Sequence, residues 1–199
     1  MTEVLFDIDK TLFNSSVLME GFNNRLSIET GVEVSTLINI YSDYISGLES
    51  RTDFEPSGFI KKLANETRIE TKILNDIFFD KRIYKKALYP EVIDVLKELK
   101  QSGISMGTFS EGRVNFQMEK LEMAGINHFF EGPMIIERRK LSDESINRIP
   151  EGSIIIDDKR DVVEKLHLFK KFKLFWINRN DNEKIPGIKT INNLLEITK

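Results

Sequence analysis

The amino-acid sequence predicts an α/β fold, a mostly parallel β-sheet with helices on both faces, into which an all-helical segment is inserted. From residue 87 onward, apolar runs of strand length alternate with patterns of helical spacing, and strands connected through helices form parallel sheets with right-handed crossovers. By contrast, residues 15–86 show only helical periodicity. We therefore expect a core formed by residues 1–14 and 87–199 and a helical domain formed by residues 15–86.

The strands of the core are predicted where short apolar runs end at polar or turn-forming residues. The first run, Val-Leu-Phe at positions 4–6, lies directly before two aspartates, and the run at 153–156 is the clearest candidate for a strand buried on both faces. The other predicted strands cover residues 104–109, 134–136 and 174–177. Helices are predicted over residues 92–99, 113–124, 142–147 and 162–169, with a terminal helix from residue 192.

The inserted segment is predicted to hold four helices separated by glycine-containing or polar turns. An asparagine or serine at positions 14–16 caps the first helix, and Gly31 ends it, because glycine readily adopts the left-handed conformation found after helices. Ser35 is the predicted cap of the second helix. The third begins at Pro56 after a polar loop, and the fourth covers residues 69–79.

The composition narrows the class of protein and its surroundings. The chain of 199 residues has no cysteine, which excludes disulfides and thiol catalysis and is typical of a reducing compartment. It contains no apolar run near the ~20 residues of a membrane-spanning helix and opens with no secretory leader. Its net charge of -3 gives no reason to expect nucleic acid as a partner, and we expect no membrane partner. We therefore expect a soluble cytoplasmic protein, while its oligomeric state stays open.

Three predicted strands end in polar side chains that are not required for the packing of those strands. Asp7 and Asp9 follow the first strand, Ser110 follows the second, and Asp157 and Asp158 end the run at 153–156. All carboxyl ends of a parallel sheet lie at one edge, so these groups can meet although about 150 residues separate them. Carboxylates buried together need a cation or a proton. This pattern predicts a metal-assisted site at that edge.

The motifs around these residues resemble those of the haloacid dehalogenase superfamily, most of whose members are phosphatases that use an aspartate nucleophile and magnesium. Residues 6–12, Phe-Asp-Ile-Asp-Lys-Thr-Leu, resemble the first signature, Asp-x-Asp-x-Thr. The strand that ends at Ser110, the lysine at position 140 and the acidic pair at 157 and 158 resemble the other three, in the same order. The resemblance implies a Rossmann-like core, with residues 15–86 as the helical C1 cap of that superfamily.

The resemblance also implies roles for the catalytic residues. Asp7 would attack phosphorus and bind Mg²⁺, forming an aspartyl-phosphate. Asp9 would protonate the leaving alcohol and then activate water, touching the metal only through its backbone carbonyl. Ser110, with Thr108 as its alternative, would donate a hydrogen bond to a phosphoryl oxygen. Lys140 would pair with the phosphate and with the nucleophile.

The remaining implied site residues concern the metal and the phosphate. Asp158 is the expected direct ligand of Mg²⁺, and Asp157 is expected to hold a metal-bound water. Thr11 and Glu111, which lie in the first signature and just after the second, complete the predicted phosphate-binding set.

The leading hypothesis is a magnesium-dependent phosphatase acting on a small phosphorylated metabolite. Phosphate monoesters hydrolyse extremely slowly unaided, so their negative charge must be neutralised before a nucleophile approaches. A phosphomutase, which would need a bound bisphosphate and an excluded water, is the alternative within the superfamily. A non-catalytic phosphate-binding or regulatory domain is the alternative outside enzymes, but it has no reason to keep crowded carboxylates. Asp9 argues against a dehalogenase, since dehalogenases of this superfamily lack an acid there.

The inserted helices are expected to set substrate specificity, although no motif within them says for which substrate. Their basic residues, Arg25, Arg51, Lys81 and Arg82, are interpreted as solvent-exposed rather than as substrate ligands. Hydrolysis of a generic aryl phosphate that depends on magnesium would separate an enzyme from a binding domain.

Overall fold

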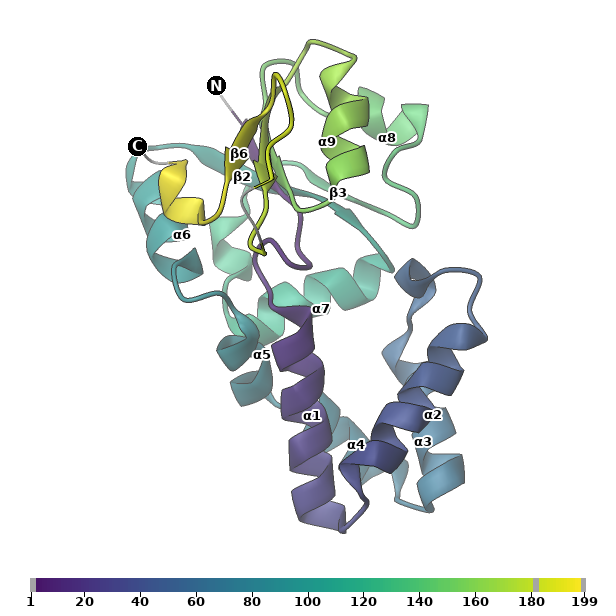
Figure 1. Ribbon diagram of the computed structural model, residues 1–199. Coiled ribbons are helices and arrows are strands. Elements are labelled where there is room, and N and C mark those ends of the chain that lie inside the picture. Colours follow the sequence, from purple (N-terminus) through teal and green to yellow (C-terminus); the bar gives the residue numbers. More distant parts are fainter. Residues whose placement is uncertain (1–2, 181–182, 198–199) are drawn as a thin grey trace.

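A six-stranded parallel sheet lies at the centre of the computed structural model, which describes residues 3–180 and 183–197 (Figure 1). The strands follow the order β3-β2-β1-β4-β5-β6, and every neighbouring pair is parallel. Their bounds are β1 Glu3–Phe6, β2 Ser105–Glu111, β3 Met134–Glu137, β4 Ile154–Asp157, β5 Lys173–Ile177 and β6 Lys189–Ile191. Because β1 lies between β2 and β4, the strand order reverses there, and open α/β sheets bind ligands beyond the carboxyl ends of their strands at such a point.

Helices cover both faces of the sheet, which confirms the predicted fold class. They are α6 Val92–Gln101, α7 Val114–Ala124, the 3₁₀ turn η2 Asn127–Phe129, α8 Asp143–Asn147 and α9 Arg160–His167. Val4 and Phe6 of β1 pack into the core shared with α6 and α7, whereas Leu5 packs into the core shared with α8 and α9. Successive strand residues point to opposite faces, so a strand covered on both sides needs an uninterrupted apolar run.

The inserted segment forms a layer of helices beside the carboxyl edge of the sheet (Figure 1). Over residues 15–79 its helices are α1 Ser15–Thr30, α2 Val34–Ser46, α3 Pro56–Thr67 and α4 Thr71–Phe78, with a 3₁₀ turn η1 Arg51–Asp53. Their apolar faces share a third hydrophobic core that includes Phe22, Leu37 and Phe59, and Phe116 of α7 packs against it. This helical domain is therefore fixed to the sheet domain through α7.

The start of the second helix differs from the prediction. Asn14, one of the predicted caps of the first helix, does cap α1 through its side-chain oxygen. The prediction that Ser35 caps the second helix is wrong, because α2 begins at Val34 and Ser35 lies in its first turn. The carbonyl of Glu33 already accepts a helical hydrogen bond from Leu37, at 3.2 Å.

The sequence pattern did not predict one short helix and one short strand. Helix α5, Lys81–Ala87, buries Ile83 and Tyr84 in the core of the sheet domain, while its basic side chains face solvent as expected. Strand β6, Lys189–Ile191, extends the sheet beside β5. Both elements are too short for hydrophobic periodicity to reveal them.

The predicted terminal helix is wrong over residues 192–197. A single 3₁₀ turn, η3 Leu194–Glu196, takes its place, with Asn193 as a side-chain cap. One turn is enough to bury Leu194 completely, so packing does not require a longer helix. Residues 198–199 of the predicted helix lie outside the described residues. Among the helices that the structure describes, none has both the length and the apolar character required to cross a membrane.

Candidate active site

The loop after β1 presents two aspartates at the edge of the sheet. The backbone N–H of Asp7 donates to the carbonyl of Ile156 on β4 at 2.9 Å, so the chain stays attached to the sheet as β1 ends. Lys10 takes the left-handed conformation, with φ of 60°, and turns the chain back. The guanidinium of Arg179 donates to the carbonyls of Lys10 and Thr11, the latter at 2.9 Å. The loop after β1 is therefore held both by β4 and by Arg179.

Three carboxylates meet at this edge, as the sequence predicts. Asp7, Asp157 and Asp158 each offer a carboxylate oxygen, and these atoms lie within 4.8 Å of one another. Burial and the negative charge of Asp7 raise the pKa of Asp157 and Asp158 above the ordinary aspartate value. Hard oxygen ligands in this number are what Mg²⁺ prefers, and a cation would relieve the repulsion among them.

Lys140 lies at the centre of the acidic cluster. Its Nζ donates to Asp7 Oδ1 at 2.8 Å and to Asp157 Oδ2 at 2.5 Å, and its side chain is fully buried. Burial opposes the charge of Lys140, but the two carboxylates outweigh it and raise the pKa of the lysine. The lysine of the turn after β3 is thus charged and in contact with the predicted nucleophile.

The two aspartates at the end of β4 have different hydrogen bonds. Asp157 Oδ1 accepts from the backbone N–H of Lys159 at 2.9 Å, and Asp157 Oδ2 accepts from Lys140, so both oxygens have protein donors. In residues 3–180 and 183–197, no side-chain or backbone donor reaches the carboxylate of Asp158, which lines a cavity. Asp158 is therefore the better placed of the two for a direct metal bond.

Two predicted phosphate-binding hydroxyls are buried without a partner. Among the described residues, the Oγ of Ser110 and the Oγ1 of Thr11 make no hydrogen bond, although both side chains are almost completely buried. Leaving a buried hydroxyl unpaired costs free energy, so both groups are suited to bind a ligand with oxygen atoms. Thr108, the alternative to Ser110, instead donates to the sulfur of Met134.

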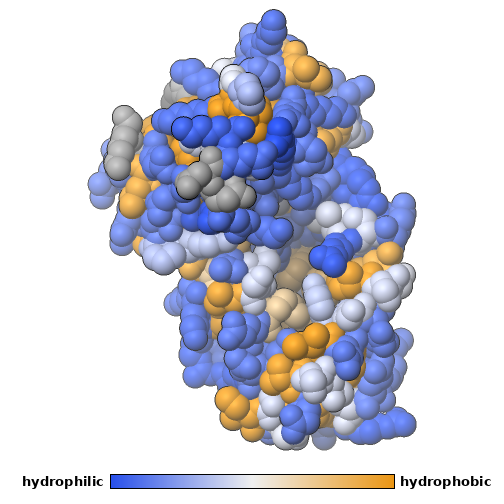
Figure 2. Space-filling model, in the orientation of Figure 1, coloured by the Kyte–Doolittle hydropathy of each residue, from blue (hydrophilic) through white to orange (hydrophobic). Residues whose placement is uncertain are grey.

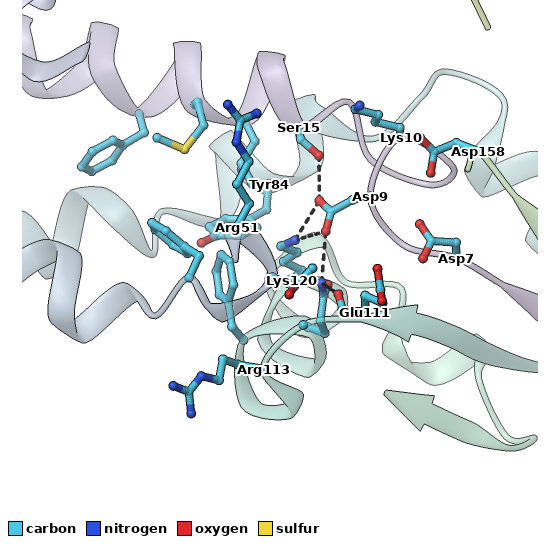
Figure 3. Close-up of a pocket in the computed structure, with 18 of the residues that line it drawn as sticks. Asp7, Asp9, Lys10, Ser15, Arg51, Tyr84, Glu111, Arg113, Lys120 and Asp158 are labelled. Carbon is cyan, nitrogen blue, oxygen red and sulfur yellow. Dashed lines mark hydrogen bonds and ion pairs between the residues drawn. The ribbon is translucent and has the colours of Figure 1, made fainter. Parts of the chain in front are cut away.

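Asp9 is held by three side chains whose contacts with it the sequence analysis did not predict (Figure 3). It accepts from Ser15 Oγ at 2.6 Å, from Gln117 Nε2 at 3.0 Å, and from Lys120 Nζ at 2.7 and 2.8 Å. Burial raises the pKa of Asp9, but the charge of Lys120 and these hydrogen bonds outweigh it and lower the pKa to about 2. The carboxylate is therefore ionised at neutral pH and able to accept a proton.

Gln117 and Lys120 lie three residues apart on α7, so both side chains emerge on the same face of that helix. They are buried polar residues in a helix that follows the Ser110 strand directly. That spacing was the available sequence signal, but a lysine in an amphipathic helix is normally exposed.

Glu111, a predicted phosphate-binding residue, is surrounded by basic groups. Its carboxylate forms an ion pair with Lys159 and accepts from the backbone N–H of Lys140 at 3.3 Å. Lys159, which the sequence analysis also missed, follows the acidic pair of β4 directly and lines the same cavity. Lys159 is thus one of several lysines near this edge of the sheet, with Lys10, Lys120 and Lys140.

The turn that carries Lys140 also contacts the helical domain. Arg138 Nε donates to Asp53 Oδ1 at 2.6 Å, and Arg139 Nη1 donates to Thr52 Oγ1 at 2.9 Å. The hydrogen bond from Arg138 lowers the pKa of Asp53 below its ordinary value. These contacts join the 3₁₀ turn η1 to the turn that carries Lys140, so the position of the helical domain and the site are linked.

A cavity of about 300 Å³ lies between the sheet edge and the helical domain (Figure 3). Asp7, Asp9 and Asp158 form its polar end. The rest of its wall comes from α1, α2, η1, α4, α5, α7 and the segments beside them, and it combines apolar and aromatic side chains with charged ones such as Arg51 and Lys120. Arg51, predicted to be exposed, is exposed and borders the same cavity.

A parallel α/β domain with aspartates at the ends of β1 and β4, a lysine between them and a helical insertion after β1 defines a hydrolase of the haloacid dehalogenase type. Residues 4–151 match the family model described as haloacid dehalogenase-like hydrolase, which covers more than half of the chain. The chain belongs to this family. This match confirms the resemblance to the haloacid dehalogenase superfamily that the four signatures indicated.

Two curated relatives have the name glyceraldehyde 3-phosphate phosphatase. The protein from Methanocaldococcus jannaschii is 28% identical over 135 residues and the one from Methanopyrus kandleri is 31% identical over 136 residues. Each match covers 64% of this chain and 58% of the relative, so the chain spans little more than half the length of these relatives.

Among solved structures, the HAD-hydrolase YfnB from Bacillus subtilis, bound to magnesium, has a TM-score of 0.62 and 16% identity, covering 98% of this chain and 96% of YfnB. This likeness shows the shared fold.

Proposed function

We propose that this protein is a magnesium-dependent phosphatase that hydrolyses a small phosphorylated metabolite through an aspartyl-phosphate. The observation that carries the proposal is the arrangement around Asp7, whose carboxylate contacts the Lys140 ammonium within a cluster of three acids. The unpaired hydroxyls of Ser110, near the end of β2, and of Thr11, in the loop after β1, are suited to phosphoryl oxygens. The names of the two archaeal relatives support the same reaction class.

The acidic cluster fits a magnesium ion. Asp7 and Asp158 would bind it directly, the backbone carbonyl of Asp9 would complete the protein ligands, and Asp157 would hold a metal-bound water. When bound, the ion would neutralise negative charge on the carboxylates and on the phosphate. The repulsion that raises the pKa of Asp157 and Asp158 is what a divalent cation removes.

In the first half of the proposed reaction, a carboxylate oxygen of Asp7 attacks phosphorus. The bond between phosphorus and the ester oxygen breaks, and the leaving oxygen takes a proton from Asp9. Lys140 and Ser110 hold the phosphoryl oxygens while charge develops on them. Asp9 must carry a proton at this stage, so it must leave the close contact with Lys120 described above.

In the second half, Asp9 accepts a proton from water. The water oxygen attacks phosphorus, the bond to Asp7 breaks, and inorganic phosphate leaves with the carboxylate restored. The ionised state that Lys120, Gln117 and Ser15 give to Asp9 is the one required for this base. The contacts of Asp9 therefore favour the base role in the described conformation.

A direct test measures release of inorganic phosphate from 4-nitrophenyl phosphate. We expect turnover that stops with a chelator and returns with Mg²⁺, without any added bisphosphate. A strict need for a bisphosphate would favour the phosphomutase alternative. Binding of phosphate without turnover under any metal condition would favour a non-catalytic domain.

A second expectation concerns the phosphate-binding hydroxyl. Ser110→Ala should lower kcat/KM by about 10- to 100-fold, because it removes a hydrogen bond to a charged group. It should not lower the melting temperature, since the hydroxyl has no partner in the described structure. Thr108→Val, which keeps the shape of a neighbouring side chain, is the matched control and should change kcat/KM little. A larger loss in Thr108→Val than in Ser110→Ala would assign the phosphate contact to Thr108.

A further inference from the structure

The wall of the cavity opposite the acidic cluster is built from apolar and aromatic side chains. From the helical domain come Leu18, Met19, Phe22, Tyr41, Phe54 and Phe78. Phe116 of α7 joins them from the sheet domain, with its ring centroid 5.4 Å from that of Phe54 and 6.2 Å from that of Phe78. Figure 2 shows the surface hollowed between the two domains, with hydrophobic residues in the recess. The wall is therefore continuous across the domain boundary.

Besides the acids, the polar side chains that border the cavity include Lys10, Arg51 and Arg113, which are exposed to solvent, and the phenol of Tyr41 in the aromatic wall. Tyr84 is almost fully buried and borders the cavity, and its phenol has no hydrogen bond within residues 3–180 and 183–197. Burial raises the pKa of Tyr84, so the phenol keeps its proton and can donate. The Gln117 amide and the Lys120 ammonium also border the cavity, but both already donate to Asp9. A polyhydroxylated leaving group placed against the aromatic wall would regain few of its hydrogen bonds to water, because the phenols of Tyr41 and Tyr84 are the polar groups that this wall offers.

The size of the cavity limits the leaving group as well. A cavity of about 150 Å³ is enough for benzene. The volume here is about 300 Å³, and the phosphate must occupy part of it at the acidic end. The remaining space suits one aromatic ring or a branched alkyl chain of similar size.

We propose that the substrate is a phosphate monoester whose leaving group has a compact apolar body, an aryl-alkyl or branched-alkyl group, instead of a sugar or polyol. This inference rests on the proposed phosphatase function and names the substrate class for the same site. The acidic end and Lys140 receive the phosphate, and the aromatic wall receives the apolar body. The phenols of Tyr41 and Tyr84 receive at most one or two polar atoms of the leaving group.

The experiment compares phosphate monoesters of primary alcohols, so that leaving-group reactivity stays nearly matched. With Mg²⁺ present, we expect higher kcat/KM for 2-phenylethyl phosphate and isopentyl phosphate than for glycerol 3-phosphate and glyceraldehyde 3-phosphate, by about tenfold or more. The difference should lie mostly in KM, because burial of a ring or a branched alkyl chain strengthens binding by about this factor. Equal or higher kcat/KM for the two polyol-type esters overturns the inference but leaves the phosphatase function intact.

A pair of variants on α1 tests whether the wall causes the preference. Met19→Gln places an amide in the wall and should reduce the ratio of kcat/KM for 2-phenylethyl phosphate to that for glycerol 3-phosphate by about fivefold or more. Ile28→Gln is the matched control, because Ile28 lies on the same helix but is 84% exposed and outside the cavity. An unchanged ratio in Met19→Gln would show that the wall does not select the substrate.

Binding measurements keep the inference testable without turnover. Isothermal titration with Mg²⁺ present compares 3-phenylpropylphosphonate with 3,4-dihydroxybutylphosphonate, neither of which can be hydrolysed. We expect the phenyl compound to bind about tenfold more tightly. Turnover failing while this preference holds would reject the phosphatase function alone. Tighter binding of the dihydroxy compound, or equal binding, would reject the substrate class.

Discussion

Replacing Asp7 by asparagine should reduce kcat by about 10⁴-fold or more, because loss of a nucleophile removes the covalent route itself. The amide oxygen of asparagine can still accept a hydrogen bond from Lys140, which now binds Asp7 Oδ1 at 2.8 Å. The melting temperature should change little, because Asp7→Asn weakens one ion pair of Lys140, which keeps Asp157 as its partner, and also removes a charge that repels Asp157 and Asp158. Activity and thermal unfolding of the same preparation measure both effects.

The control for this variant is Asp161→Asn, which removes a carboxylate from the exposed first turn of α9. It has the same change in net charge and should keep activity within about twofold, since surface substitutions act weakly. Activity of Asp7→Asn within tenfold of the unmodified protein would exclude Asp7 as the nucleophile. A parallel loss in Asp161→Asn would point to a general charge effect.

Asp158→Asn and Asp157→Asn should separate metal binding from folding stability. In Asp158→Asn, we expect the magnesium concentration for half-maximal activity to rise by about 100-fold, while the melting temperature stays the same or increases. Asp158 has no hydrogen-bond donor among the described residues, so its replacement breaks no contact there.

Asp157→Asn should affect folding stability more, and the magnesium requirement less, than Asp158→Asn does. Both oxygens of Asp157 accept hydrogen bonds, one of them from the buried Lys140, so its replacement weakens a buried ion pair. Removing one partner of such a pair typically costs about 3–5 kcal/mol, and the second carboxylate at Lys140, Asp7, should reduce this loss. We therefore expect a lower melting temperature and a smaller rise in the magnesium requirement than in Asp158→Asn. A larger rise in Asp157→Asn would make Asp157 the direct ligand.

The elements that carry the acidic cluster could be predicted from the sequence. Each strand is specified locally by its apolar run, and a parallel sheet brings all carboxyl ends to one edge, so Asp7, Ser110, Asp157 and Asp158 could be placed together without any knowledge of packing. The buried Lys140 contact with Asp7 agrees with the role that its signature implies. The four helices of the insertion were also evident from their periodicity, apart from the start of α2.

The partners of Asp9 and the wall of the cavity were decided by the tertiary structure. Lys120 and Gln117 reach Asp9 because α7 packs across the end of β1, and no local pattern states which face of a helix will meet a residue more than 100 positions away. Arg138 reaches Asp53 in the same way, across the boundary between the domains.

The difference between the features that the sequence predicts and those that the tertiary structure decides has a physical cause. Local sequence periodicity determines which residues form strands and helices and which side chains share a face, because the backbone repeat is fixed. Electrostatic and apolar contacts act over a few ångströms. The choice of substrate and the ionisation of Asp9 therefore depend on distances between helices and strands that only tertiary packing brings together. The sequence by itself therefore determined the sheet and the acids at its edge, while the closure of Phe54, Phe78 and Phe116 over that edge was decided by how the helical domain packs on α7.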